Sequence, residues 1–317
     1  SSGHHFPWDC RRFAARRRTD EAFRDVIAYR IWADLERGWR VTMPNLEQCG
    51  LLEIDYEGLD ELAADRDIWR DCHPTLLGAS PETREKISRV LLDHLRRRLA
   101  INVRWLDPNE QEALRQRALQ NLSDRWTLDE RERLRRASTA FPRSRRRGDW
   151  REYEFVSGRG AFGRWLRKTG TFPNLASRLT VDDTDQIIRD LFEKLRLAGL
   201  VEVAVYPESA GDVPGYQVKA DAMRFRVGGG SRAFFDPIRT PDRPETDPRT
   251  NSYFVRFYRE VARDLVGLEA REHTAQVPAE VRMDREKRFR EAQLPVLYAS
   301  PTMELGVDIA ELNAVYL

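Results

Sequence analysis

The sequence has 317 residues, of which 41% are hydrophobic and 33% are charged. That length accommodates two or three small domains with real cores, and the large charged share predicts much exposed helix. The formal net charge is only +2, which excludes a chain that binds polyanions through its overall charge. Any contact with nucleic acid must therefore come from local basic patches.

The three cysteines, Cys10, Cys49 and Cys72, are widely spaced and odd in number. This usage argues against a disulfide framework and predicts a reducing compartment, which we take to be the cytoplasm. No CxxC pair occurs, so we expect no metal site. The sequence has no apolar run of 18 residues and no signal-peptide pattern, so we expect no membrane association.

Residues 1–150 are predicted to be rich in helix. Four apolar side chains at four-residue spacing predict a helix from Glu21 to about Arg37, with one buried stripe. The stripe consists of Phe23, Ile27, Ile31 and Leu35. The alternation in residues 51–56 then predicts a short strand.

The next helix is predicted to begin at Ser80 and Pro81, an N-cap followed by a proline at the first helical position. Its apolar stripe leaves Arg96-Arg97-Arg98 on the outer side, and His94 is interpreted as a packed histidine rather than a catalytic one. Two further helices are predicted from Pro108 and over residues 130–140, the second opened by a capping box.

Residues 141–149, Phe-Pro-Arg-Ser-Arg-Arg-Arg-Gly-Asp, are predicted to form a linker. Its four arginines suit contacts with phosphates, which guanidinium groups bind in a bidentate manner. The alternative is a solvated loop beside the acidic residues 129–132.

A small α/β unit is predicted from residue 151 to residue 230, beginning with a strand over 153–156. The following Gly158-Arg-Gly-Ala-Phe-Gly163 matches a dinucleotide-binding GxGxxG and part of a Walker A pattern. Both matches are weak, because Arg164 and Trp165 replace the lysine and hydroxyl that Walker A needs, and no second strand ending in an acid follows. An NAD(P)-dependent enzyme is therefore an unfavoured alternative to a glycine-rich turn at a helix start, which can still hold a backbone phosphate.

Later in this unit, Thr180-Val-Asp-Asp183 predicts a capped helix that ends at Gly199. Strands are predicted over 200–206 and 215–220 with a turn between them. Helix, strand, turn and strand is the order of a winged helix. The exposed face of the helix carries mixed charge, which leaves DNA contact and protein packing equally open. That face is predicted to hold Asp185, Arg189, Glu193, Lys194 and Arg196.

A Gly/Pro-rich linker is predicted over residues 231–250. Beyond it we expect a helix over 252–265, a strand reaching His273, a helix over 278–291 and a strand over 296–299. Strand, helix and strand in this order predict a parallel sheet.

The last strand leads into Ala299-Ser-Pro-Thr-Met-Glu-Leu-Gly-Val-Asp-Ile309. This stretch resembles motif V of the superfamily 2 helicases, in their second RecA-like domain, with Ser300 where the family commonly has threonine. Glu272-His273-Thr274 and the helix ending Arg288-Phe289-Arg290 also match that domain. The wider chain, including residues 29–50, looks like the large bacterial DEAD/DEAH-box helicases of DISARM-type phage-defence systems.

The resemblance implies roles for seven residues. Ser300, Pro301, Thr302, Gly306, His273 and Thr274 would contact nucleic acid, and Gly306 and Asp308 would contact ATP. The resemblance also implies that the full-length parent uses ATP and Mg²⁺ as cofactors. The implied partners are nucleic acid (DNA favoured over RNA), the first RecA-like domain and other defence-system subunits.

No G-x-x-x-x-G-K-[ST] sequence and no strand ending in Asp-Glu occurs in the chain, and the arginine-rich motif VI is expected beyond Leu317. We therefore expect an internal fragment that has no catalytic residues and no ATPase activity by itself. The alternative is a non-enzymatic winged-helix module that binds nucleic acid or regulates another protein.

The expected fold class is α/β with a helix-rich region. Its predicted parts are a helical region over 1–150, a winged-helix-like domain over 151–230, the linker over 231–250 and half of a RecA-like parallel α/β domain over 251–317.

Overall fold

The computed structural model divides the chain into two compact units, residues 1–255 and residues 256–317. Both units mix helices with strands, and the sheets include parallel and antiparallel pairs. Residue 150, where we expected one region to end, lies inside the first unit. The structure describes residues 8–36, 44–123, 126–129, 131–150, 152–173, 175, 177–207, 209, 211–239, 249–261, 270–273 and 277–299.

The first unit begins with helix α1 (Trp8–Asp34), which confirms the predicted helix and starts earlier. The predicted apolar stripe is wrong in its middle: Leu35 is buried as expected, but Ile27 and Ile31 are 40% and 47% exposed, and Tyr29 is buried instead. The buried face also carries Asp25, which accepts hydrogen bonds from two arginines and a tryptophan of the following segments. Because a buried, hydrogen-bonded aspartate interrupts the apolar residues of this face, the spacing of apolar residues alone does not identify which face of α1 is buried.

Two short helices, α2 (Leu59–Ala64) and α3 (Pro74–Leu77), precede the long helix α4 (Pro81–Arg96). The predicted start of α4 is confirmed, because the Ser80 hydroxyl accepts the backbone N–H of Thr83. This cap satisfies one of the N–H groups that the first helical turn leaves without a partner.

The last turn of α4 contradicts the prediction that Arg96 lies outside. Its side chain is fully buried, and its guanidinium donates to Glu47 at 2.8 and 2.9 Å and to Asp93 at 2.9 Å. The Tyr56 hydroxyl accepts a further bond at 3.2 Å. Arg96 therefore fastens the segment after α1 and the first strand to this helix.

The next part of the chain forms η1 (Arg104–Leu106) and helix α5 (Pro108–Asn121), which starts at the predicted proline. The helix predicted over 130–140 is wrong, because the described residues 131–139 have no regular structure. Their backbone groups bond to distant partners instead: Arg135 donates its N–H to the Tyr29 hydroxyl at 2.9 Å. Tertiary contacts thus override the helical propensity of a charged segment.

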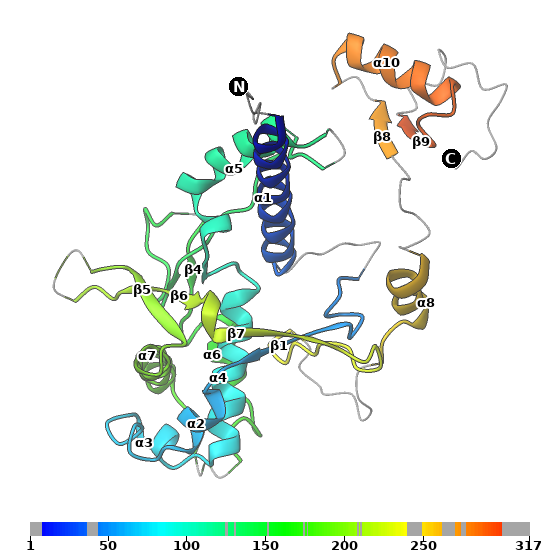
Figure 1. Cartoon of the computed structure of the whole chain (residues 1–317). Coiled ribbons are helices and arrows are strands. Elements are labelled where there is room, and N and C mark those ends of the chain that lie inside the picture. Colours follow the sequence, from blue (N-terminus) through cyan, green and yellow to red (C-terminus); the bar gives the residue numbers. More distant parts are fainter. Residues whose placement is uncertain are drawn as a thin grey trace, which may run out of the picture. The chain divides into compact units, whose positions relative to one another are not determined.

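The central sheet of this unit has the strand order β2-β6-β3-β4, with β5 paired to the other side of β6. Strand β6 is parallel to β2 and antiparallel to β3 and β5, while β3 and β4 are parallel. The strands are β2 (Ile101–Asn102), β3 (Ala140–Phe141), β4 (Glu154–Phe155), β5 (Val201–Val205) and β6 (Gly215–Lys219). In Figure 1 the β5–β6 hairpin projects to the left, and α7 lies beneath it.

Helices α6 (Ala161–Leu166) and α7 (Val181–Leu197) pack together against this sheet. The predicted capping box of α7 is confirmed, because the Thr180 hydroxyl and the Asp183 carboxylate each accept the other residue's backbone N–H. The apolar face of α7 is buried in the core, as its spacing predicted. Its fully buried residues are Ile187, Ile188, Leu191, Phe192 and Leu195.

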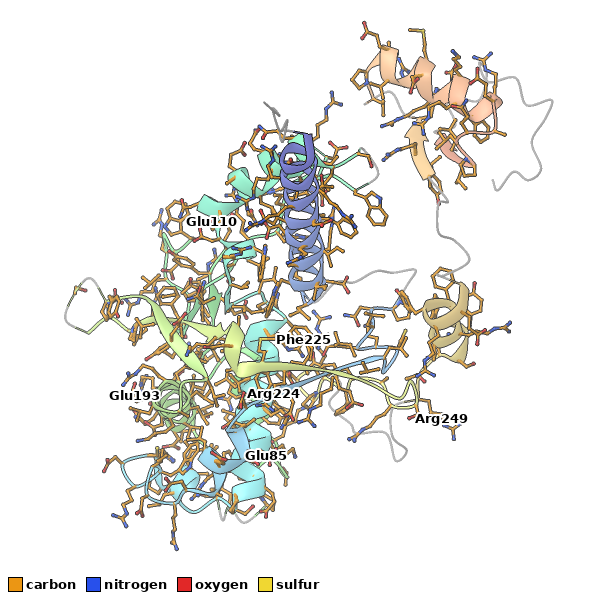
Figure 2. The ribbon with its side chains drawn as sticks, viewed as in Figure 1. Glu85, Glu110, Glu193, Arg224, Phe225 and Arg249 are labelled. Carbon is orange, nitrogen blue, oxygen red and sulfur yellow. The ribbon has the colours of Figure 1, made fainter. Side chains whose placement is uncertain are left out.

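A two-stranded antiparallel ribbon joins β1 (Leu52–Tyr56) to β7 (Met223–Val227), which follows η2 (Ala220–Ala222). The sequence predicted β1 but neither β7 nor the pairing. Arg224 and Phe225 lie next to each other near the start of β7 (Figure 2). The Phe225 ring meets the Trp32 ring edge-to-face, with 5.4 Å between the ring centroids.

Helix α8 (Ser252–Arg256) is followed by a π-helical turn, η3 (Phe257–Val261). Within the second unit, β8 (Ala270–His273), α10 (Ala279–Arg290) and β9 (Val296–Ala299) confirm the predicted strand, helix and strand. Strands β8 and β9 are parallel, as expected. None of the described helices combines the length and the apolar character needed to cross a bilayer.

Candidate functional site

The second unit places the ends of two parallel strands side by side. In the register of β8 and β9, Ala270 lies opposite Val296 and His273 lies opposite Ala299. Parallel strands bring their carboxyl ends to one edge of a sheet, where α/β folds collect ligand-binding groups. In the sequence, Thr274 and Ser300 follow these two ends directly.

His273 is the one predicted site residue among the described residues. Its side chain is 1% exposed, and its Nε2 lies 2.5 Å from Glu286 Oε1 of α10. Its Nδ1 is buried and has no hydrogen-bond partner among the described residues. The ring therefore joins β8 to α10 in this conformation, and its contact with nucleic acid stays a prediction.

The other predicted site residues lie outside the described residues. They are Thr274, Ser300, Pro301, Thr302, Gly306 and Asp308. Their roles in binding nucleic acid and ATP therefore stay predictions.

The glycine run at residues 158–163 serves close packing. The backbone N–H of Gly158 donates to Asp185 of α7 at 2.6 Å, so this donor is already used. A Cβ at Gly163 would lie 2.4 Å from the carbonyl oxygens of Gly158 and Ser157, and a Cβ at Gly158 would lie 2.5 Å from that of Val181. Glycine is needed here because neighbouring backbone atoms fill the space that a side chain would occupy. This packing supports the interpretation as a glycine-rich turn at a helix start and not as a nucleotide-binding loop.

The outer face of α7 carries an ion pair between Arg196 and Glu193. Arg196 donates to Glu193 at 2.6 and 2.9 Å, and the Arg196 hydrogen bond lowers the pKa of that carboxyl. The prediction that Lys194 lies on the exposed face is wrong, because Lys194 is 9% exposed. The mixed charge of this face is as predicted, and it presents no basic stripe to a phosphate backbone.

A groove of about 700 Å³ runs along the outer side of α4 and is lined by both signs of charge. Its basic and acidic groups are largely paired: Arg97 donates to Asp236 at 3.0 Å, and Arg89 donates to Asp55 at 2.9 Å. His94, at one side of the groove, lies 3.1 Å from Glu154 and is the packed histidine that we expected.

The arginine-rich segment after β3 folds into an ordered turn, which we call the arginine turn (residues 142–150). Arg143 donates to Asp149 through two bonds of 2.7 and 2.8 Å, and this contact lowers the pKa of the Asp149 carboxyl to about 2. The backbone N–H of Arg146 also donates to Asp149 at 2.5 Å. The Arg143 guanidinium stacks over the Phe155 ring at 4.9 Å. A bidentate side-chain pair, one backbone hydrogen bond and a stacked cation thus fix the turn in one shape.

The arginine turn is joined to the loop of the β5–β6 hairpin. Arg146 donates to Asp212 of that loop at 2.9 Å. At the first residue of β6, a Cβ on Gly215 would lie 2.7 Å from the Phe141 ring, so the base of the hairpin directly contacts the residue before the turn. The sequence suggested that these arginines suit phosphate contacts, but it did not indicate that the hairpin lies next to them.

Comparison of the chain with protein-family models, with curated proteins and with solved structures finds no match. The class that the geometry defines is a mixed α/β protein whose sheets include parallel strands.

Proposed function

We propose that this chain carries the first half of the second RecA-like domain of an ATP-dependent superfamily 2 helicase or translocase. The observation that carries the proposal is the β8–α10–β9 unit, whose parallel strands end together at His273 and Ala299. The motif V-like sequence begins at that point of the chain. Parallel pairing through a helical crossover is the geometry that a RecA-like sheet requires.

In this proposal the loop after β9 holds one strand of nucleic acid. The Ser300 hydroxyl and the backbone N–H groups near Gly306 donate to phosphate oxygens, and glycine allows the backbone to approach closely. Asp308 accepts a hydrogen bond from the ATP ribose. The Mg²⁺-bound γ-phosphate is held by the parent's first RecA-like domain, because the chain has no P-loop sequence. DNA is the favoured substrate, and cytoplasmic phage defence is the proposed setting.

The test is the affinity of the full chain for a fluorescent single-stranded oligonucleotide, measured by anisotropy at low salt. Ser300→Ala/Gly306→Ala is expected to weaken binding about 10-fold, since each phosphate contact is charge-assisted. The matched control is Ser231→Ala/Gly229→Ala, which makes the same two changes in an exposed loop. The Cβ added at Gly229 meets no backbone atom there. Equal affinities for the two variants would contradict the proposal.

A second candidate is a winged-helix module that binds nucleic acid or a regulatory partner without ATP chemistry. Helix α6 contacts both α4 and α7, so these three helices pack together. Strand β6 lies between β2 and its hairpin partner β5. This order supports a winged helix with a long insertion between its first strand and second helix. Full, salt-sensitive binding by the Ser300→Ala/Gly306→Ala variant would favour this candidate.

A further inference from the structure

We propose that the arginine turn and the adjoining base of the β5–β6 hairpin form a surface that binds single-stranded nucleic acid. Arg145 and Arg147 contact phosphates there, and Trp150 and Tyr206 stack on bases. The surface lies in the first unit and uses none of the residues that the motif V resemblance selects. The choice of nucleic acid as the ligand rests on the proposed function, whereas the position of the binding surface does not.

The turn contains two arginines paired with carboxylates and two that are not. Of the second kind, Arg145 donates to the backbone carbonyl of Asp149 at 3.4 Å and lies over the Phe155 ring at 5.9 Å. Asp149 binds Arg143, and Asp212 binds Arg146, so two of the four arginines are neutralised within the unit. Arg145 and Arg147 are exposed and have no carboxylate partner among the described residues. Two positive charges thus remain on a rigid support. Because the framework is already ordered, binding costs little conformational entropy.

The aromatic side chains supply the second part of the surface. Trp150 is 70% exposed and Tyr206 is 76% exposed, although tryptophan and tyrosine normally bury most of their apolar area. Trp150 directly follows Asp149, the carboxylate that organises the turn. An ordered backbone therefore presents a large π face to solvent next to a turn whose charge is only partly neutralised by carboxylates.

The sheet brings the start of the arginine turn and Tyr206 to one end. Strand β3 is antiparallel to β6 with Ala140 opposite Tyr216, so the turn leaves β3 where β6 begins. Strand β5 ends at the same place, because Val205 lies opposite Gly215. Tyr206 is the next residue. The arginine turn and the end of β5 therefore flank the first residue of β6.

The combination favours single-stranded nucleic acid over a duplex. Every base has a π face, but that face is accessible for stacking only when the strand is unpaired, and stacking needs no particular sequence. A phosphate backbone supplies the matching negative charge. The alternative occupant is an acidic protein surface, since arginine and tryptophan are also enriched at protein interfaces.

The experiment measures anisotropy of a labelled dT oligonucleotide and of a matched duplex with the full chain, over a range of salt concentrations. Arg145→Ala/Arg147→Ala is expected to lower the slope of log affinity against log salt by about 1.4, or about 0.7 for each lost phosphate contact on a single strand. Trp150→Ala is expected to weaken single-strand binding about 10-fold with little change in that slope, and Trp150→Phe is expected to restore most of the affinity.

The control variant is Arg66→Ala/Arg70→Ala, which removes two exposed arginines from the loop after α2 and changes the net charge equally. An unchanged salt slope in Arg145→Ala/Arg147→Ala, or the same slope change in the control, would overturn the proposal. Equal losses for single strand and duplex in Trp150→Ala would exclude base stacking and favour the acidic protein partner.

The two proposals fail separately. If Ser300→Ala/Gly306→Ala weakens binding while the arginine-turn variants do not, the further inference fails and the proposed function stands. The reverse pattern leaves the arginine-turn surface in place and removes the role of the motif V-like loop.

Discussion

Two arginine runs in the first unit have opposite surroundings. At the end of α4, Arg96 is buried against carboxylates, Arg97 donates to Asp236 at 3.0 Å, and Arg98 lies 3.6 Å from Glu154. In the arginine turn, Arg145 and Arg147 have no carboxylate partner among the described residues. The difference shows that the number of arginines in a run does not indicate a ligand site. The acids that the fold brings to each run decide between a structural and a binding role.

The largest effect that this comparison predicts is on stability. Arg96→Met is expected to destabilise the first unit by about 3–5 kcal/mol, because it leaves the buried Glu47 and the half-buried Asp93 without their cation. Urea unfolding followed by tryptophan fluorescence would measure it. The companion variant Arg98→Met changes a side chain that is 43% exposed and should cost less than about 1 kcal/mol. Similar losses in the two variants would contradict the structural role of Arg96.

The second prediction concerns pH and the arginine turn. The pKa of Asp149 is lowered to about 2, so its stabilising contact is fully present above the ordinary carboxyl pKa near 4 and is lost as the pH falls through about 2. Wild-type stability should therefore decline more steeply between pH 4 and pH 2 than that of Asp149→Asn. Urea midpoints measured across this range provide the test. Parallel pH profiles would show that Asp149 does not hold the turn.

The smallest predicted effect is the stability change of Arg145→Ala/Arg147→Ala. Since both side chains are exposed and have no carboxylate partner among the described residues, the unfolding free energy should change by less than about 0.5 kcal/mol. A loss above 1 kcal/mol in the urea titration would assign these arginines a structural role like that of Arg96.

Local sequence signals predicted much of the fold. The caps at Ser80 and Thr180 and the strand–helix–strand order of residues 270–299 are confirmed because each depends on neighbouring residues. The failures depend on distant ones. Arg96 is paired in the core with Glu47, which lies 49 positions away in the sequence. Strand β1 pairs with β7, and most of the sequence of the first unit lies between these two strands.

The candidate sites show the same division. The sequence selected His273, but its pairing with Glu286 depends on how α10 packs on β8. It also noted the arginines of the turn without predicting which ones are neutralised, because Asp212 comes from another hairpin. Trp150 and Tyr206 were missed, since exposed aromatics are recognised only after burial is known.

The most direct test is photo-crosslinking of the full chain to a single-stranded oligonucleotide containing 4-thiothymidine, followed by mapping of the modified peptides. If both proposed surfaces bind nucleic acid, crosslinks are expected within residues 145–150 and within residues 299–308. Crosslinks confined to α1 or to the outer face of α7, with neither of these segments modified, would contradict both proposals.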